Sequence, residues 1–272
     1  ADTAFKDRLA SHGLAFCELS SVATPRPDAL AAFTETLLTA VPADRFSDPP
    51  LLSDLIGSGD IVILVTPIDL EAPKGRMILP QVQAIRDALD AEAVCAVVKE
   101  KELPFLLEQL RTPPRLVVCD SQVVLKVSAD VPKSIRMTTF STLFSRYKGD
   151  LRELAAGAAR LDSLTKDSRV LIAEACTHHP IGDDIGRVKI PRWLRQYLGF
   201  DVRIDHAAGQ DFPDDLGAYD LVIHCGACLL NRRHMLWRIR EARKRGVAIT
   251  NYGIAISKLQ GVLPRILEPF GL

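Results

Sequence analysis

The chain has 272 residues, which is enough for about two compact domains at roughly 150 residues each. Hydrophobic residues make up 47% and charged residues 25% of the sequence, a composition typical of folded globular proteins and not of disordered ones. Lys plus Arg and Asp plus Glu both number 34, so the chain is neutral and we expect no nucleic-acid partner. No apolar run reaches the roughly 18 residues of a membrane span, and 6 cysteines are too few for a disulfide scaffold. We therefore expect a cytoplasmic protein without a membrane partner.

The sequence of residues 1–46 predicts too few helices and strands to form a domain by itself. Leu14–Leu19 has the apolar pattern of a short strand, and residues 28–38 carry apolar side chains at helical spacing after a possible N-cap at Asp28. One strand and one or two helices cannot bury a core alone. We therefore interpret residues 1–46 as the end of a larger domain.

Residues 47–130 predict a first sheet. A Pro-rich break at residues 47–50 precedes three apolar strands that alternate with helices. The strands are expected at residues 60–66, 93–98 and 115–119, and the helices at residues 79–90 and 101–110. Continuous apolar strands alternating with helices are typical of a small, mostly parallel sheet with both faces covered.

Residues 131–272 predict a second, doubly wound α/β domain. Two helices are expected first, at residues 138–147 and 151–161. Strands and helices then alternate, with strands at residues 170–175, 202–205, 221–224 and 247–251 and helices at residues 191–198, 232–245 and 257–267.

Two short motifs in this second domain concentrate cysteine and histidine. Cys176-Thr-His178-His179 and His224-Cys225-Gly-Ala-Cys228 each follow directly on an apolar strand. Because the carboxyl ends of parallel strands meet at one edge of a sheet, we expect both motifs at the same edge. Cys228 also lies shortly before an expected helix, whose N-terminal dipole lowers thiol pKa and favours anionic ligands.

The residues alone leave four interpretations of these motifs open. They could be buried structural cysteines, a dithiol redox pair of Cys225 and Cys228, a structural zinc site with three cysteines and one histidine, or an iron–sulfur cluster with a fourth, exchangeable ligand. Spacing does not separate zinc from iron–sulfur. The remaining cysteines are predicted to be buried, inert thiols within strands, and the remaining isolated histidines to lie at the surface or on helix faces: Cys17, Cys95, Cys119, His12, His206 and His234.

A charged loop at residues 182–192 follows Cys176 in the sequence. It is either a solvated loop or a wall of the site, in which Arg187, Lys189 and Arg192 supply positive charge to an anionic cluster or partner. The chain has no phosphate-binding loop and no Asn-Lys-x-Asp guanine motif, so we do not expect it to hydrolyse GTP by itself.

The two motifs together resemble the HydF family, the maturation GTPases of FeFe hydrogenase. The resemblance rests on Cys-x-His, a spacer of about 45 residues and His-Cys-x-x-Cys, and on the segments around them. These segments include Val65-Thr-Pro-Ile-Asp69, Ala72-Pro-Lys-Gly-Arg76, Lys189-Ile-Pro-Arg192, Asn231-Arg-Arg233 and Thr250-Asn-Tyr-Gly253. It covers nearly the whole chain from about residue 48.

The resemblance implies a Ras-like GTPase domain, a dimerisation domain and a cluster-binding domain. Residues 1–46 would be the last strand and helix of the first, residues 47–130 the second and residues 131–272 the third. By match to the family motif, Cys176, Cys225 and Cys228 would hold a 4Fe–4S cluster with one labile iron site. His178 and His224 would be fourth ligands or hydrogen-bond donors to its sulfides, and Arg187 and Lys189 would line the site.

The resemblance also implies a role and partners. The chain would be a scaffold rather than an enzyme, with GTP bound only by the full-length family. It would receive a diiron precursor from two radical enzymes and deliver it to the apo FeFe-hydrogenase. We expect a homodimer through the strands between residues 60 and 119, because pairing removes an open sheet edge. The alternatives are a zinc-stabilised interaction module and a thiol oxidoreductase that uses Cys225 and Cys228.

Overall fold

The computed structural model describes residues 3–19, 27–40, 49–67, 77–175, 184–209, 212–227 and 230–272. These residues fall into two compact units, Ala1–Pro49 and Pro50–Leu272. Among them, no helix combines the length and apolar character needed to cross a membrane.

The first unit contains two helices, α1 (Thr3–Ser11) and α2 (Pro27–Ala40). α2 agrees with the helix expected at residues 28–38, and neither helix has a buried side chain. The described residues 14–19 form no strand, so the strand expected there is wrong. A strand needs a neighbour to satisfy its backbone groups, and the apolar pattern of this segment does not provide one.

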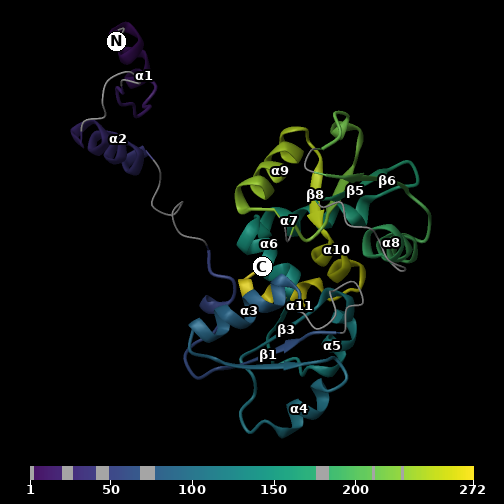
Figure 1. Ribbon diagram of the computed structural model, residues 1–272. Coiled ribbons are helices and arrows are strands. Elements are labelled where there is room, and N and C mark those ends of the chain that lie inside the picture. Colours follow the sequence, from purple (N-terminus) through teal and green to yellow (C-terminus); the bar gives the residue numbers. More distant parts are fainter. Residues whose placement is uncertain are drawn as a thin grey trace. The chain divides into compact units, whose positions relative to one another are not determined.

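The second unit begins with a four-stranded parallel sheet in the order β2-β1-β3-β4. Figure 1 labels its central strands β1 and β3. Its strands are β1 (Ile61–Val65), β2 (Val94–Val98), β3 (Leu116–Cys119) and β4 (Met137–Thr139), and its helices are α3 (Leu79–Asp90), α4 (Leu103–Gln109), α5 (Val124–Asp130) and α6 (Phe140–Lys148). The central strands β1 and β3 are buried almost throughout, as their continuous apolar sequences predict.

The fourth strand of this sheet differs from the sequence-based expectation of three strands. Met137 pairs with Val117 on β3, and the strand continues to Thr139. The sequence instead predicts a helix over residues 138–147. The helix α6 begins only after Thr139, whose hydroxyl accepts a hydrogen bond from Thr142 N at 3.1 Å. The sheet therefore continues past residue 130, where the change in composition suggested a domain boundary, because strand pairing overrides the local helical pattern.

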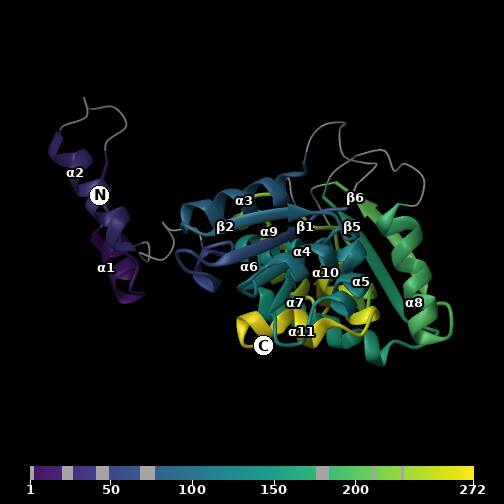
Figure 2. The ribbon, with the colours of Figure 1, turned by 90° about the horizontal axis from the view of Figure 1, so that it is seen from below.

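A second parallel sheet follows, with the order β6-β5-β7-β8. Its strands are β5 (Arg169–Glu174), β6 (Arg203–Ala208), β7 (Leu221–His224) and β8 (Ala248–Asn251), and its helices are α7 (Leu151–Ala158), α8 (Ile190–Leu198), α9 (Arg232–Lys244), α10 (Tyr252–Leu259) and α11 (Leu263–Leu267). α8 runs alongside β5 and β6 (Figure 2). The strands confirm the expected alternation, whereas the single helix expected at residues 257–267 is two helices that begin at Tyr252.

The two sheets share one hydrophobic core, which includes Ile63 of the first sheet and Ile172 of the second. α10 and α11 lie between the sheets (Figure 1). On β4, the Thr138 hydroxyl donates to the carbonyl of Ile266 in α11 at 3.1 Å. Arg265, also on α11, donates to the carbonyl of Ser128 in α5 at 2.6 Å. The second unit is therefore a single packed body.

Gly157 on α7 provides a test of the packing of this helix against β8. A Cβ atom at Gly157 would lie 1.9 Å from the carbonyl oxygen of Ile249, so Gly157→Ala must push the helix off the sheet. We expect the free energy of unfolding to fall by about 1–3 kcal/mol, measured by urea denaturation. Gly217→Ala is the control, since its Cβ would meet no atom within 4 Å. Equal stability of the two variants would contradict this packing.

Candidate metal centre

Cys225 follows directly on β7, at the carboxyl edge of the second sheet. β7 pairs with β5 so that His224 lies opposite Ala173. One step further, the backbone N–H of Ala175 donates to the sulfur of Cys225 at 3.2 Å. The strand order reverses between β5 and β7, which is where open α/β sheets bind their ligands. The structure therefore brings the end of β5, up to the residue before Cys176, against Cys225.

The other two predicted cysteine ligands lie outside the described residues. Cys176, His178 and Cys228 belong to segments that the structure does not describe, so their roles stay predictions. Cys225 is a half-buried thiol outside any disulfide. Within the described ranges, which omit two of the three predicted thiolates, no group of three or more His, Cys, Asp or Glu side chains could hold a metal ion.

His224 is fully buried and both of its ring nitrogens have partners. A guanidinium nitrogen of Arg238 lies 2.7 Å from Nε2, and the carbonyl oxygen of Cys225 lies 2.7 Å from Nδ1. A guanidinium can only donate, so Nε2 accepts and Nδ1 carries the proton that it donates to Cys225. Burial lowers the pKa of His224 to about 4, so the ring is neutral at pH 7. In this arrangement His224 orients the backbone of Cys225 and has no nitrogen free for iron.

Arg238, on α9, is a buried residue next to the candidate site that the sequence analysis missed. Its side chain is 1% exposed; its second terminal nitrogen donates to the carbonyl of Gly209 at 2.7 Å, and its guanidinium lies 4.8 Å from the centre of the Phe212 ring. It thereby joins the ends of β6 and β7 to α9. The sequence does carry a signal, because Arg238 falls on the same helix face as the buried Met235 and Ala242.

A buried carboxylate stands at the end of β5. Glu174 is 5% exposed, accepts a hydrogen bond from the Tyr252 hydroxyl at 3.2 Å and lies 3.8 Å from a guanidinium nitrogen of Arg187. Burial, together with the negative charges of Glu174 and then Cys225, raises the pKa of Tyr252. Tyr252 therefore remains a neutral hydrogen-bond donor beside the thiol.

The π-helical turn Ile185–Lys189 supplies the predicted basic residues. Asp184 begins the turn by accepting a hydrogen bond from Arg187 N at 2.6 Å. Gly186 lets the turn approach Tyr252 closely, since a Cβ there would lie 2.2 Å from the Tyr252 hydroxyl oxygen. Arg187 thus borders the site through Glu174, whereas Lys189 donates to the Gln122 side chain at 2.7 Å.

The remaining cysteines and histidines differ in part from expectation. Burial raises the pKa of both Cys95 and Cys119, although Cys95 is only half-buried. Cys17 is also half-buried and is not in a strand, because its segment has no paired neighbour. His206 is exposed on β6, as expected of a surface residue, with Nε2 3.3 Å from the Gly186 carbonyl oxygen. His12 is exposed, and His234 packs edge-on against Trp237 on α9.

Two family models match the chain. One describes the hydrogen maturase F dimerization domain and matches residues 51–149, and the other describes the hydrogen maturase F tetramerization domain and matches residues 152–269. The chain belongs to the hydrogen maturase F (HydF) family. A comparison with curated proteins finds no significant match.

The two matched HydF domains correspond to the two sheets. The dimerization domain contains all four strands of the first sheet, and the tetramerization domain contains all four strands of the second. Cys176, Cys225 and Cys228 all fall within the tetramerization domain. Both domains are named for self-association, so this HydF chain carries the family's surfaces for assembly.

Arg238 provides a test of how the end of β7 is held. Arg238→Met leaves His224 Nε2 and the Gly209 carbonyl without this donor in a buried position. We expect the free energy of unfolding to fall by about 2 kcal/mol or more, measured by urea denaturation of the metal-free protein. Arg240→Met on the same helix removes an exposed charge and should change stability by less than about 0.5 kcal/mol. Equal effects of the two substitutions would show that the buried guanidinium has no special role.

Proposed function

We propose that this HydF chain is a scaffold of FeFe-hydrogenase maturation. In this proposal Cys176, Cys225 and Cys228 hold a 4Fe–4S cluster, and the chain carries a diiron precursor to the apo-hydrogenase after receiving it from two radical enzymes. The observation that supports the site is the hydrogen bond from Ala175 N–H to the sulfur of Cys225. It joins the segment that leads to Cys176 with the segment that contains Cys225.

The described part of the site fits an iron–sulfur cluster. Backbone N–H groups that donate to cysteine sulfur stabilise thiolates and tune the clusters that they bind. Arg187 adds a positive charge near the end of β5, where it would offset the negative charge of a cluster. The three cysteines would leave one iron without a protein thiolate. When bound, the cluster would supply this iron as an open coordination position for another ligand.

The position of His224 bears on the zinc alternative. A structural site of the three-cysteine, one-histidine type needs a histidine nitrogen directed at the metal. Both nitrogens of His224 are bonded to protein atoms, so within the described residues this histidine does not favour zinc. His178 remains the histidine on which such a site would depend.

Anaerobic reconstitution with iron and sulfide tests the cluster. We expect about four irons per chain and a 4Fe–4S electron paramagnetic resonance signal after reduction. Cys225→Ser should abolish both, because a ligand is lost, whereas Cys95→Ser on the edge of the first sheet should retain both. A colourless protein with one zinc per chain would contradict the proposal. A thiol-exchange activity that survives Cys176→Ser would instead support the oxidoreductase.

We further propose, from the family resemblance, that residues 1–46 are the end of a Ras-like GTPase domain. The agreement of α2 with the expected last helix supports this assignment, whereas the strand expected at residues 14–19 does not form. GTP binding and hydrolysis would then belong to the full-length family rather than to this chain.

The partner of the dimerization domain is proposed to be a second copy of the chain, paired along β2. The opposite edge strand, β4, is completely buried and is contacted by α11. β2 is an edge strand too, but Val94 is 56% and Val97 43% exposed. An exposed apolar edge strand is a template for strand pairing, so β2 is the edge that a second copy would cover.

Two lysines introduced on β2 would test this interface. The double variant Val94→Lys, Val97→Lys brings like charges together across the paired edges and should halve the mass measured by light scattering at micromolar concentration. Leu125→Lys on α5 is the control, since Leu125 is 53% exposed but lies on a helix. The β2 interface is wrong if the double variant keeps the mass of the unaltered chain.

A further inference from the structure

Two described residues of the tetramerization domain, Ala227 and Leu230, are contacted by a side chain from the dimerization domain. Lys148, the last residue of α6, donates through Nζ to the carbonyl of Leu230 at 3.0 Å and lies 3.4 Å from the carbonyl oxygen of Ala227. These two carbonyls flank Cys228 in the sequence. Lys148 falls in the dimerization domain and the loop in the tetramerization domain, so the contact crosses between them.

Ala227 has a conformation that needs such support. Its φ is 53°, in the left-handed region that residues with a Cβ atom rarely adopt, and its side chain is 3% exposed. Strained residues of this kind persist only where the surrounding contacts over-determine them. Here the contacts are the hydrogen bond from Leu230 N to Ala227 O at 3.0 Å and the Lys148 ammonium.

The backbone of Lys148 is fixed in turn by the helix that follows the loop. Arg232, at the start of α9, donates to the carbonyls of Arg146, Tyr147 and Gly149 at 2.7–3.1 Å. A cation at this position satisfies the unpaired carbonyls at the end of α6 and interacts favourably with the helix dipole. The end of α6 and the beginning of α9 therefore hold each other in place.

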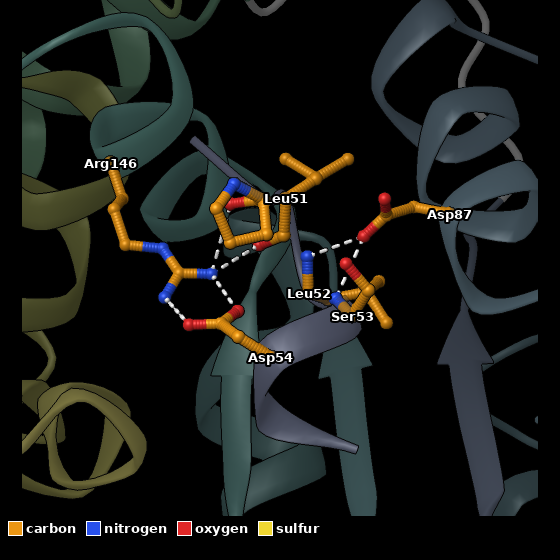
Figure 3. Close-up of polar contacts among 7 residues, drawn as sticks. Leu51, Leu52, Ser53, Asp54, Asp87 and Arg146 are labelled. Carbon is orange, nitrogen blue, oxygen red and sulfur yellow. Dashed lines mark hydrogen bonds and ion pairs between the residues drawn. The ribbon is translucent and has the colours of Figure 1, made fainter. Parts of the chain in front are cut away.

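The last turn of α6 is also anchored, through Arg146, to the beginning of the dimerization domain. Arg146 forms two hydrogen bonds of 2.7 Å to Asp54 and one of 2.8 Å to the Leu51 carbonyl (Figure 3). Asp87 of α3 accepts hydrogen bonds from the backbone N–H groups of Leu52 and Ser53, which follow Leu51 in the chain. The ammonium of Lys148 thus projects from a turn that is fixed on two sides.

We propose that Lys148 is a positioning residue for the cluster site. Its ammonium stabilises the left-handed turn between Cys225 and Cys228 and keeps a positive charge next to that turn. The inference rests on the proposed function, since it assigns the turn to cluster binding. A nearby cation favours the more negative, reduced state of a cluster, so its removal should lower the midpoint potential as well as loosen the turn.

Three substitutions at Lys148 separate these two effects. Lys148→Met removes both the donor and the charge, Lys148→Gln keeps a donor but removes the charge, and Lys148→Arg keeps both. Lys126→Met on α5 is the control, because it removes a lysine whose partner is Asp130 and which does not contact the loop. Hydrogen exchange at the Leu230 amide in the metal-free protein measures the turn. Iron loss to a chelator and the midpoint potential measure the reconstituted site.

We expect Lys148→Met to raise Leu230 amide exchange at least tenfold, to speed iron loss and to shift the potential to more negative values. Lys148→Gln should shift the potential with a smaller effect on exchange, and Lys148→Arg and Lys126→Met should resemble the unaltered chain. Unchanged Leu230 exchange and unchanged potential in Lys148→Met would overturn the inference. If Lys148→Met does not fold, the midpoint potential of Lys148→Gln tests the inference, and an unchanged potential would overturn it. Faster exchange in a chain that binds no iron would overturn the proposed function and leave the contact with the turn intact.

Discussion

The parallel pairing of β5 with β7 is the contact from which the candidate site is built. His224 lies opposite Ala173, the Cys225 amide donates to the Ala173 carbonyl, and the Ala175 amide donates to the Cys225 sulfur. These contacts bring together two segments that are about fifty residues apart in the chain, in the manner in which parallel strands meet at one sheet edge. A thiolate-rich site with three ligands from two loops needs this pairing, because neither loop has enough cysteines alone.

Buried polar groups are concentrated at the same edge of the second sheet. Arg238, His224, Glu174 and Asp184 are each 5% exposed or less, and each has hydrogen-bond partners or an ion pair among its neighbours. Buried polar groups are costly unless they are bonded, and a bonded network in a low-dielectric interior is rigid. The strand ends next to the proposed ligands are therefore fixed, even though loops carry the cysteines.

The two HydF domains are mechanically continuous in this chain. One hydrophobic core extends through both sheets, and the last turn of α6 contacts the beginning of the dimerization domain, the cysteine loop and α9. Any displacement of this turn must change the carbonyl contacts of the loop. The dimerization domain thus contacts Ala227 and Leu230, which flank the predicted ligand Cys228 in the sequence of the tetramerization domain.

The sequence by itself determined the alternation of apolar strands and helices and the position of both cysteine motifs after strands, because these follow from local hydrophobic pattern and from the rule that parallel strands end at one edge. It also led to the correct family, since the motifs and their flanks are specific. Only the tertiary structure decided that Met137–Thr139 is a strand while residues 14–19 are not, because pairing depends on a neighbour elsewhere in the chain. For the same reason the hydrogen-bond partners of Arg238, His224 and Lys148 could not be predicted from the sequence, since each partner is a carbonyl group or ring nitrogen of another element. The helical spacing of Arg238 with Met235 and Ala242 indicated only that Arg238 is buried.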